Sequence, residues 1–88
     1  MSLILQEVQE ILSYQFSLKK TEIQPETKFE LELGADSRDL LELMAAFEIT
    51  FDIEIEYEDV VDIITVQDAI DYIEKKKIAR DDLYKNLG

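Results

Sequence analysis

The sequence predicts an all-α fold, a small antiparallel bundle of three main helices and one short helix, with a long loop between the first two. Three segments repeat apolar residues at the spacing of a helix. Two of these segments follow good helix-capping residues, Asp36 and Thr65. The segment that alternates apolar and acidic residues, 52–56, is short and has no partner strand elsewhere, so we expect an extended link there.

The first helix is predicted over residues 2–16. Its apolar stripe consists of Ile4, Val8, Ile11 and Leu12. The connection 17–33 contains Pro25 among polar residues, which argues against a continuing helix. Because this connection is long for a compact domain, we expect a functional loop or a hidden short turn. The side chains expected to pin it to the core are Ile23, Phe29 and Leu31.

The second helix is predicted to begin at Ser37 and to end near Phe51. Asp36 suits the N-cap, and Asp39 suits the third helical position, where a carboxylate faces the positive end of the helix dipole. No glycine or proline interrupts this segment. Its apolar stripe consists of Leu40, Leu43, Met44, Phe47 and Phe51.

A short helix is predicted over residues 57–63, and the last helix follows Thr65. The side chains of the short helix expected to pack inward are Val60, Val61 and either Ile63 or Ile64. Asp68 lies three residues after Thr65 and completes an approximate capping box. The core face of the last helix consists of Val66, Ala69, Ile70 and Ile73.

The bundle is expected to end near Lys77. Residues 75–77 are three lysines, and cations are favourable at the C-terminal end of a helix. The bundle is therefore assigned to residues 1–77. Residues 78–88 are assigned to a C-terminal tail that either extends the helix or frays.

The composition limits the partners and the chemistry. The net charge of −12 excludes nucleic acid as a ligand and disfavours anionic membranes. Residues 30–74 hold fifteen acids and a single base, Arg38, so this region should attract basic partner proteins. The absence of cysteine and histidine removes disulfides, thiolate metal sites and the commonest general base. We expect a cytoplasmic monomer with no resident metal, no catalytic residues and no membrane insertion.

The most informative motif is Gly34-Ala35-Asp36-Ser37. Gly34 allows a tight turn with positive φ. If Asp36 caps the helix, Ser37 takes the first helical position and its hydroxyl is not used in capping. An anion attached there would be favoured by the unpaired N–H groups of the helix start. Since no activating base accompanies Ser37, the motif indicates a place where another enzyme attaches a group.

The stretch Leu33-Gly34-Ala35-Asp36-Ser37 resembles the modification motif of acyl carrier proteins. Residues 47–55 resemble the end of that family's second helix, and residues 64–73 resemble its last helix. The resemblance covers residues 8–75. It implies that Ser37 carries a 4′-phosphopantetheine arm, transferred from coenzyme A by a phosphopantetheinyl transferase, with Gly34 and Asp36 shaping the site. The arm would hold acyl groups as thioesters for fatty-acid or related lipid or polyketide synthesis, and the chain would not be an enzyme.

The resemblance also implies that acyl-processing enzymes dock through basic patches on the second helix. The candidate docking residues are Arg38, Asp39, Leu41, Glu42, Ala45, Glu48 and Ile49. Each exposed ion pair would contribute only ~0.2–1 kcal/mol, which suits transient exchange between partners. In this family the space between the helices can admit an acyl chain.

Two residues depart from the family pattern. Arg38 stands where the family usually has leucine, and Ile49 stands where an acid is usual. A cation beside the phosphate would either fold back on it or repel basic partners. These departures favour a specialised carrier with dedicated partners over a housekeeping one.

Other interpretations of the sequence remain open at this point. The cargo could be an amino acid or an aryl acid, or the serine could stay unmodified in a pure interaction module. An enzyme is disfavoured because no nucleophile–base pair or phosphate loop is visible. A calcium loop at residues 52–58 is disfavoured because it lacks the central glycine of such loops.

Overall fold

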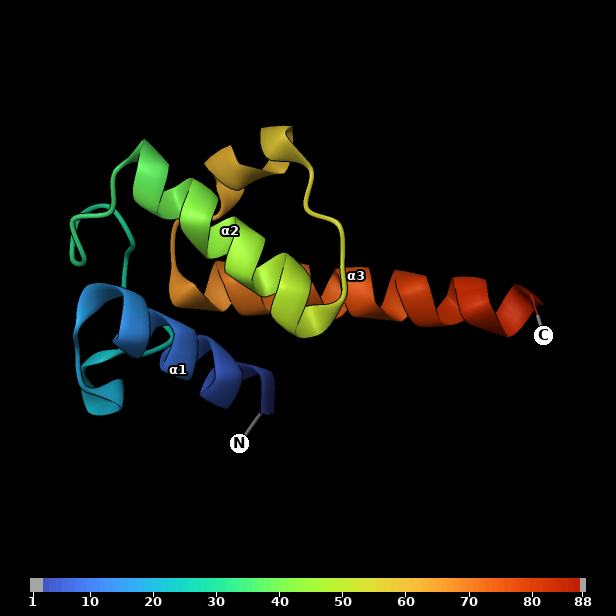
Figure 1. Cartoon of the computed structure of the whole chain (residues 1–88), viewed down its shortest axis with the longest axis horizontal. Helices are drawn as coiled ribbons and strands as arrows, with labels where there is room; N and C mark the ends of the chain where they lie inside the picture. Colours follow the sequence, from blue (N-terminus) through green and yellow to red (C-terminus); the bar gives the residue numbers. More distant parts are fainter. Residues whose placement is uncertain (1–2, 88) are drawn as a thin grey trace.

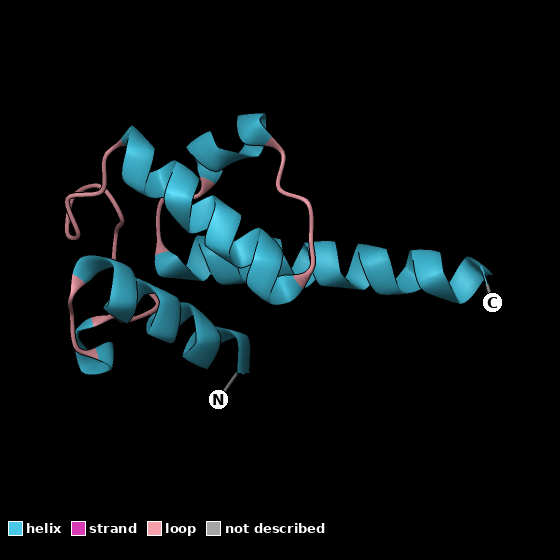
Figure 2. Ribbon diagram, viewed as in Figure 1, coloured by secondary structure: helices cyan, strands magenta, loops and turns pink. Residues whose placement is uncertain are grey.

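The computed structural model describes residues 3–87, with side chains described for residues 3–83. Its α-helices are α1 (Leu3–Phe16), α2 (Ser37–Phe51) and α3 (Val66–Leu87). Two short 3₁₀ helices, η1 (Lys20–Glu22) and η2 (Tyr57–Asp62), lie in the connections (Figure 2). Within residues 3–87 there is no β-strand, and the predicted all-α bundle is confirmed. Ser2, the predicted start of the first helix, lies outside the described residues.

The three long helices pack against one another, and α1 contacts both α2 and α3 (Figure 1). The N-terminal helix runs antiparallel to each of the other two. In contrast, α2 and α3 run in the same direction, because the chain crosses back through η2 before α3 begins (Figure 1). The beginnings of α2 and α3 therefore lie toward the same end of the molecule, with η2 beside α2.

The core is built from the faces that the helical periodicity predicts. Val8 and Leu12 of α1 are fully buried, whereas Ile4 and Ile11 are partly buried. The buried residues of α2 are Leu43, Met44, Phe47 and Phe51, with Leu40 partly buried against them. The predicted core face of α3 is buried throughout, at Val66, Ala69, Ile70 and Ile73.

The loop between α1 and α2 is held to the start of α3 by backbone hydrogen bonds. Phe29 N donates to Ile64 O at 3.0 Å, and Val66 N donates to Thr27 O at 2.9 Å. Ile23 and Phe29 are buried as predicted. The prediction for Leu31 was wrong, because its side chain is 80% exposed.

The exposure of Leu31 follows from the turn in which it lies. Glu32 N donates to Lys28 O, and Gly34 N donates to Glu30 O at 3.1 Å, so residues 28–34 coil tightly. This coil directs Phe29 and Leu33 toward the core and leaves Leu31 on its outer side. The hidden short turn that the loop length indicated is present twice, as η1 and as this coil.

The predicted short helix is a 3₁₀ helix, and its period decides which side chains are buried. With three residues per turn, the face of Val60 leads to Ile63, whose N–H donates to Val60 O at 3.1 Å, and Val61 lies on the next face. Ile63 is buried and Val60 partly buried, as expected. Val61 is 78% exposed, so its predicted burial was wrong, and Ile64 is also exposed.

The last helix begins as predicted and continues through the tail, which is the first of the two alternatives given for it. Asp68 N donates to the Thr65 hydroxyl at 3.1 Å, and Thr65 N donates to the Asp68 carboxylate at 3.0 Å, which confirms the capping box. The helix continues to Leu87, so residues 75–77 lie within it and not at its C-terminal end. The physical reason is the absence of glycine and proline between Val66 and Leu87.

Candidate functional site

The candidate site is built on the first turn of α2. Asp36 is the N-cap, with extended backbone angles, and its carboxylate accepts a hydrogen bond from Asp39 N at 2.9 Å. The Asp39 carboxylate accepts one in return from Asp36 N at 3.1 Å, which completes a capping box. These two acids therefore fix the point at which the helix begins.

Ser37 is the first residue of α2 and is exposed to solvent. Because Asp36 supplies the cap, the Ser37 hydroxyl is not needed for it. Within residues 3–87 that hydroxyl makes no hydrogen bond. The oxygen is thus presented to solvent at the helix end where N–H groups and the dipole favour an anion.

Gly34 turns the chain into this position. Its φ is +67°, in the left-handed region where side chains are strained. A Cβ added at Gly34 would meet no atom within 4 Å, so the glycine is required by the backbone angle and not by crowding. The next residue, Ala35, is buried, and its N–H donates to Phe29 O at 3.0 Å. The loop therefore anchors the residue that precedes the N-cap of α2.

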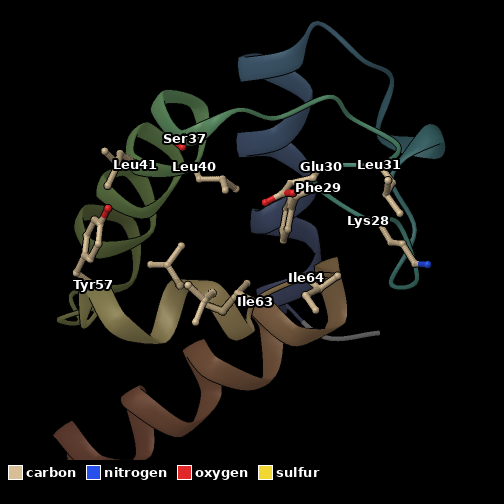
Figure 3. Close-up of a pocket in the computed structure, with 12 residues that line it drawn as sticks. Lys28, Phe29, Glu30, Leu31, Ser37, Leu40, Leu41, Tyr57, Ile63 and Ile64 are labelled. Carbon is tan, nitrogen blue, oxygen red and sulfur yellow. The ribbon is translucent and has the colours of Figure 1, made fainter.

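A groove of about 550 Å³ opens beside Ser37 (Figure 3). One side is the first part of α2, with Ser37, Leu40 and Leu41, and the loop 28–31 forms another. The remaining side is η2 with the residues that follow it, lined by Tyr57, Val60, Val61, Ile63 and Ile64. Most of these lining side chains are apolar, which suits an apolar ligand and does not suit a polar one.

The predicted docking residues fall into two groups. The first group is exposed on α2 and consists of Arg38, Leu41, Glu42, Ala45 and Ile49. The most exposed apolar member is Ile49, at 84%. The second group, Asp39 and Glu48, already has partners within the chain. Asp39 belongs to the capping box, and the Glu48 carboxylate accepts a hydrogen bond from Ile55 N at 3.0 Å.

Two side chains of α3 hold the elements around the site through contacts that no sequence pattern predicts. Tyr72 of α3 donates its hydroxyl to Asp59 of η2 at 2.7 Å. Arg80 donates to the carbonyl oxygens of Phe51 and Asp52, at the end of α2. Such contacts join residues that are far apart in the chain, so no short motif predicts them.

Among the described residues, no side chain hydrogen-bonds to the Ser37 hydroxyl, so no base is in place to activate it. Within the described residues, no three acids lie close enough together to hold a metal ion. No helix of residues 3–87 is both long and apolar enough to cross a membrane. What the geometry offers is an exposed hydroxyl at a helix start, next to an apolar groove.

Comparison with known proteins decides the family. A family model described as a phosphopantetheine attachment site matches residues 2–73. The chain belongs to this family. Its members bear a covalently attached 4′-phosphopantetheine group and are carriers, not catalysts.

A solved structure agrees with this assignment. The chain is similar to the acyl carrier protein of Enterococcus faecalis, with 33% sequence identity and a TM-score of 0.73. The match covers 83% of this chain and 92% of the other. The chain is thus an acyl-carrier-like phosphopantetheine-binding domain, and its family works with a phosphopantetheinyl transferase and with synthesis enzymes.

Proposed function

We propose that Ser37 is the attachment residue of this carrier. The observation that carries the proposal is its exposed hydroxyl at the first position of α2, with capping left to Asp36. In the modification, the Ser37 oxygen forms a bond to the pantetheine-side phosphorus of coenzyme A. The adenosine bisphosphate half leaves, and the transferase takes the hydroxyl proton. The resulting phosphodiester lies at a helix N-terminus, which stabilises its negative charge.

The residues around Ser37 suit such a group. Asp36 and Asp39 hold the helix start rigid through their reciprocal hydrogen bonds, and Gly34 supplies the positive-φ turn that precedes them. When bound, the group supplies a thiol that holds an acyl chain as a thioester. The apolar groove beside Ser37 would shelter that chain, with Leu40 and Val60 from opposite sides in contact with it.

The exposed residues of α2 are proposed as the docking surface. This surface consists of Arg38, Leu41, Glu42, Ala45 and Ile49. Asp39 and Glu48, which belong to the original docking set, would contribute less because their carboxylates are engaged within the chain. Direct contact across this surface then relies on apolar side chains and on one charge of each sign. The fifteen acids of residues 30–74 would still attract basic partners at a distance, and this attraction would weaken as salt rises.

The carrier is proposed to serve fatty-acid synthesis or a related lipid or polyketide route in the cytoplasm. The apolar lining of the groove supports an acyl cargo over an amino-acid cargo, whose ammonium group would lose hydration there. Arg38 and Ile49 support a specialised set of partners. The chain would act as a monomer.

The test is modification in vitro. Incubation with coenzyme A, Mg²⁺ and a broad-specificity phosphopantetheinyl transferase should add one phosphopantetheine per chain. Ser37→Ala should abolish the addition, whereas Ser17→Ala, which changes an exposed serine in the loop after α1, should not. Addition that persists in Ser37→Ala would move the site elsewhere, and no addition to the parent chain would favour an unmodified interaction module.

A further inference from the structure

The short helix η2 is a weakly held side of the groove. It supplies Tyr57, Val60 and Val61 to the lining, yet none of its six residues is buried. Burial of apolar surface is what normally fixes an element in place. The position of η2, and with it the width of the groove, must therefore depend strongly on specific hydrogen bonds.

Both ends of the segment that contains η2 are anchored. Before the helix, Ile55 N donates to the Glu48 carboxylate of α2 at 3.0 Å. After it, Ile64 O accepts from Phe29 N at 3.0 Å, and Ile64 N donates to the Asp68 carboxylate at 3.1 Å. Residues 56–63 form an arch between these two anchor points.

The hydrogen bonds that tie this arch to α3 come from one hydroxyl group. Tyr72 donates to the Asp59 carboxylate at 2.7 Å and accepts from Glu56 N at 3.2 Å. Among the described residues, no other hydrogen bond joins residues 56–63 to another helix. The Tyr72 hydroxyl thus uses its proton and a lone pair to hold two points of the arch at once.

Lys76, one turn further along α3, supports the same contact. Its Nζ lies 3.5 Å from the Glu56 carboxylate and 5.5 Å from the centre of the Tyr72 ring. Partial burial and the hydrogen bond to Asp59 raise the pKa of Tyr72, so the hydroxyl keeps the proton that it donates at neutral pH.

We propose that Tyr72 is a positioning residue whose hydroxyl holds η2 against α3 and thereby sets how tightly the groove closes over a chain carried on Ser37. The effect of Tyr72 on a carried chain rests on the proposed function, whereas its effect on the position of η2 does not. Tyr72 does not line the groove itself and acts on it only through Glu56 and Asp59.

The first test uses the unmodified protein and amide hydrogen exchange. Tyr72→Phe removes the hydroxyl and keeps the ring, so residues 56–63 should exchange roughly tenfold faster, as the loss of one ordinary hydrogen bond predicts. The amides of the core face of α3, such as Ile70, should change far less. Tyr14→Phe is the matched control, because the Tyr14 side chain is 90% exposed on α1.

A second variant separates this contact from general damage. Asp59→Ala removes the acceptor from the η2 side and should accelerate the same amides. The double variant should exchange little faster than Tyr72→Phe alone, because that change already breaks the hydrogen bond that Asp59→Ala removes. Unchanged exchange in Tyr72→Phe, equal acceleration in Tyr14→Phe, or fully additive effects would each overturn the proposal.

The second test uses protein loaded with an octanoyl thioester from octanoyl-coenzyme A and the transferase. Cleavage by hydroxylamine should be several-fold faster in Tyr72→Phe than in the parent chain or Tyr14→Phe, because a looser η2 exposes the thioester. Equal cleavage rates would overturn the role of Tyr72 in sheltering cargo. Failure of Ser37 to accept the group would count against the proposed function and would leave the exchange test of Tyr72 intact.

Discussion

Arg80→Ala should destabilise the fold, although Arg80 lies beyond the segment that matches the family, residues 2–73. The guanidinium Nη1 donates to Phe51 O at 2.8 Å and to Asp52 O at 3.0 Å. These carbonyl groups close the C-terminal end of α2, where a cation also complements the helix dipole. Removal of the Arg80 side chain leaves both carbonyl oxygens without this hydrogen-bond donor.

The size of the effect follows from the exposure of each contact. The bond to Phe51 O is part-buried and comes from a charged donor, so it should contribute about 1.5 kcal/mol. The bond to Asp52 O is exposed and should add about 0.5 kcal/mol. The ion pair with the Asp52 carboxylate adds little, because that carboxylate is 83% exposed. A loss of about 2 kcal/mol lowers the melting temperature of a domain of this size by roughly 8–16 °C.

The assay is thermal unfolding followed by far-ultraviolet circular dichroism, with urea unfolding as a second measure. Lys75→Ala is the matched control, because it removes one positive charge from an exposed position of the same helix. Arg80→Lys should recover only part of the loss, since an ammonium lacks the planar fork of the guanidinium. Equal melting temperatures for Arg80→Ala and Lys75→Ala would show that the Arg80 hydrogen bonds do not stabilise the fold.

Three further outcomes are expected. Gly34→Ala should lower the free energy of unfolding in urea by about 1–2 kcal/mol. The loss comes from the backbone angle, because φ is +67° and an added Cβ would clash with no atom; an unchanged midpoint would show that the turn relaxes. The melting temperature should rise with added NaCl at neutral pH, because residues 30–74 hold fifteen acids and one base, and indifference to salt would contradict this. The hydrogen bond from Thr65 N lowers the pKa of Asp68 below its ordinary value of 3.8, so its stabilisation is present above about pH 4 and is lost as the pH falls through the folded-state pKa. Asp68→Asn should therefore be less stable than the parent chain at pH 7, with a difference that narrows below about pH 4; a constant difference would argue against this linkage.

The parts of the fold that the sequence predicts well depend on local signals. Asp36 and Thr65 identify the starts of α2 and α3 because capping needs only residues within one turn. The buried faces of all three helices follow from a period sustained over several turns. The same capping argument predicts that Ser37 stands exposed at the first helical position.

The parts that the sequence does not predict depend on tertiary contacts. In a segment as short as η2, period alone does not say that Val61 faces solvent, because the 3₁₀ geometry shifts the buried face. The sequence predicts that Glu48 is a surface acid, but its carboxylate accepts a hydrogen bond from Ile55 N, seven residues away. Likewise, the pairing of Tyr72 with Asp59 joins two helices whose relative position no pattern in the chain encodes.

We propose that one exposed serine at the start of α2 bears the carrier's prosthetic group. Mass spectrometry of the protein purified from its native host, first intact and then after proteolysis, is the decisive test. We expect one phosphopantetheine per chain, mapped to the peptide that contains Ser37, with an acyl group on its thiol in part of the population. A modified peptide without Ser37, or a chain that its host leaves entirely unmodified, would contradict it.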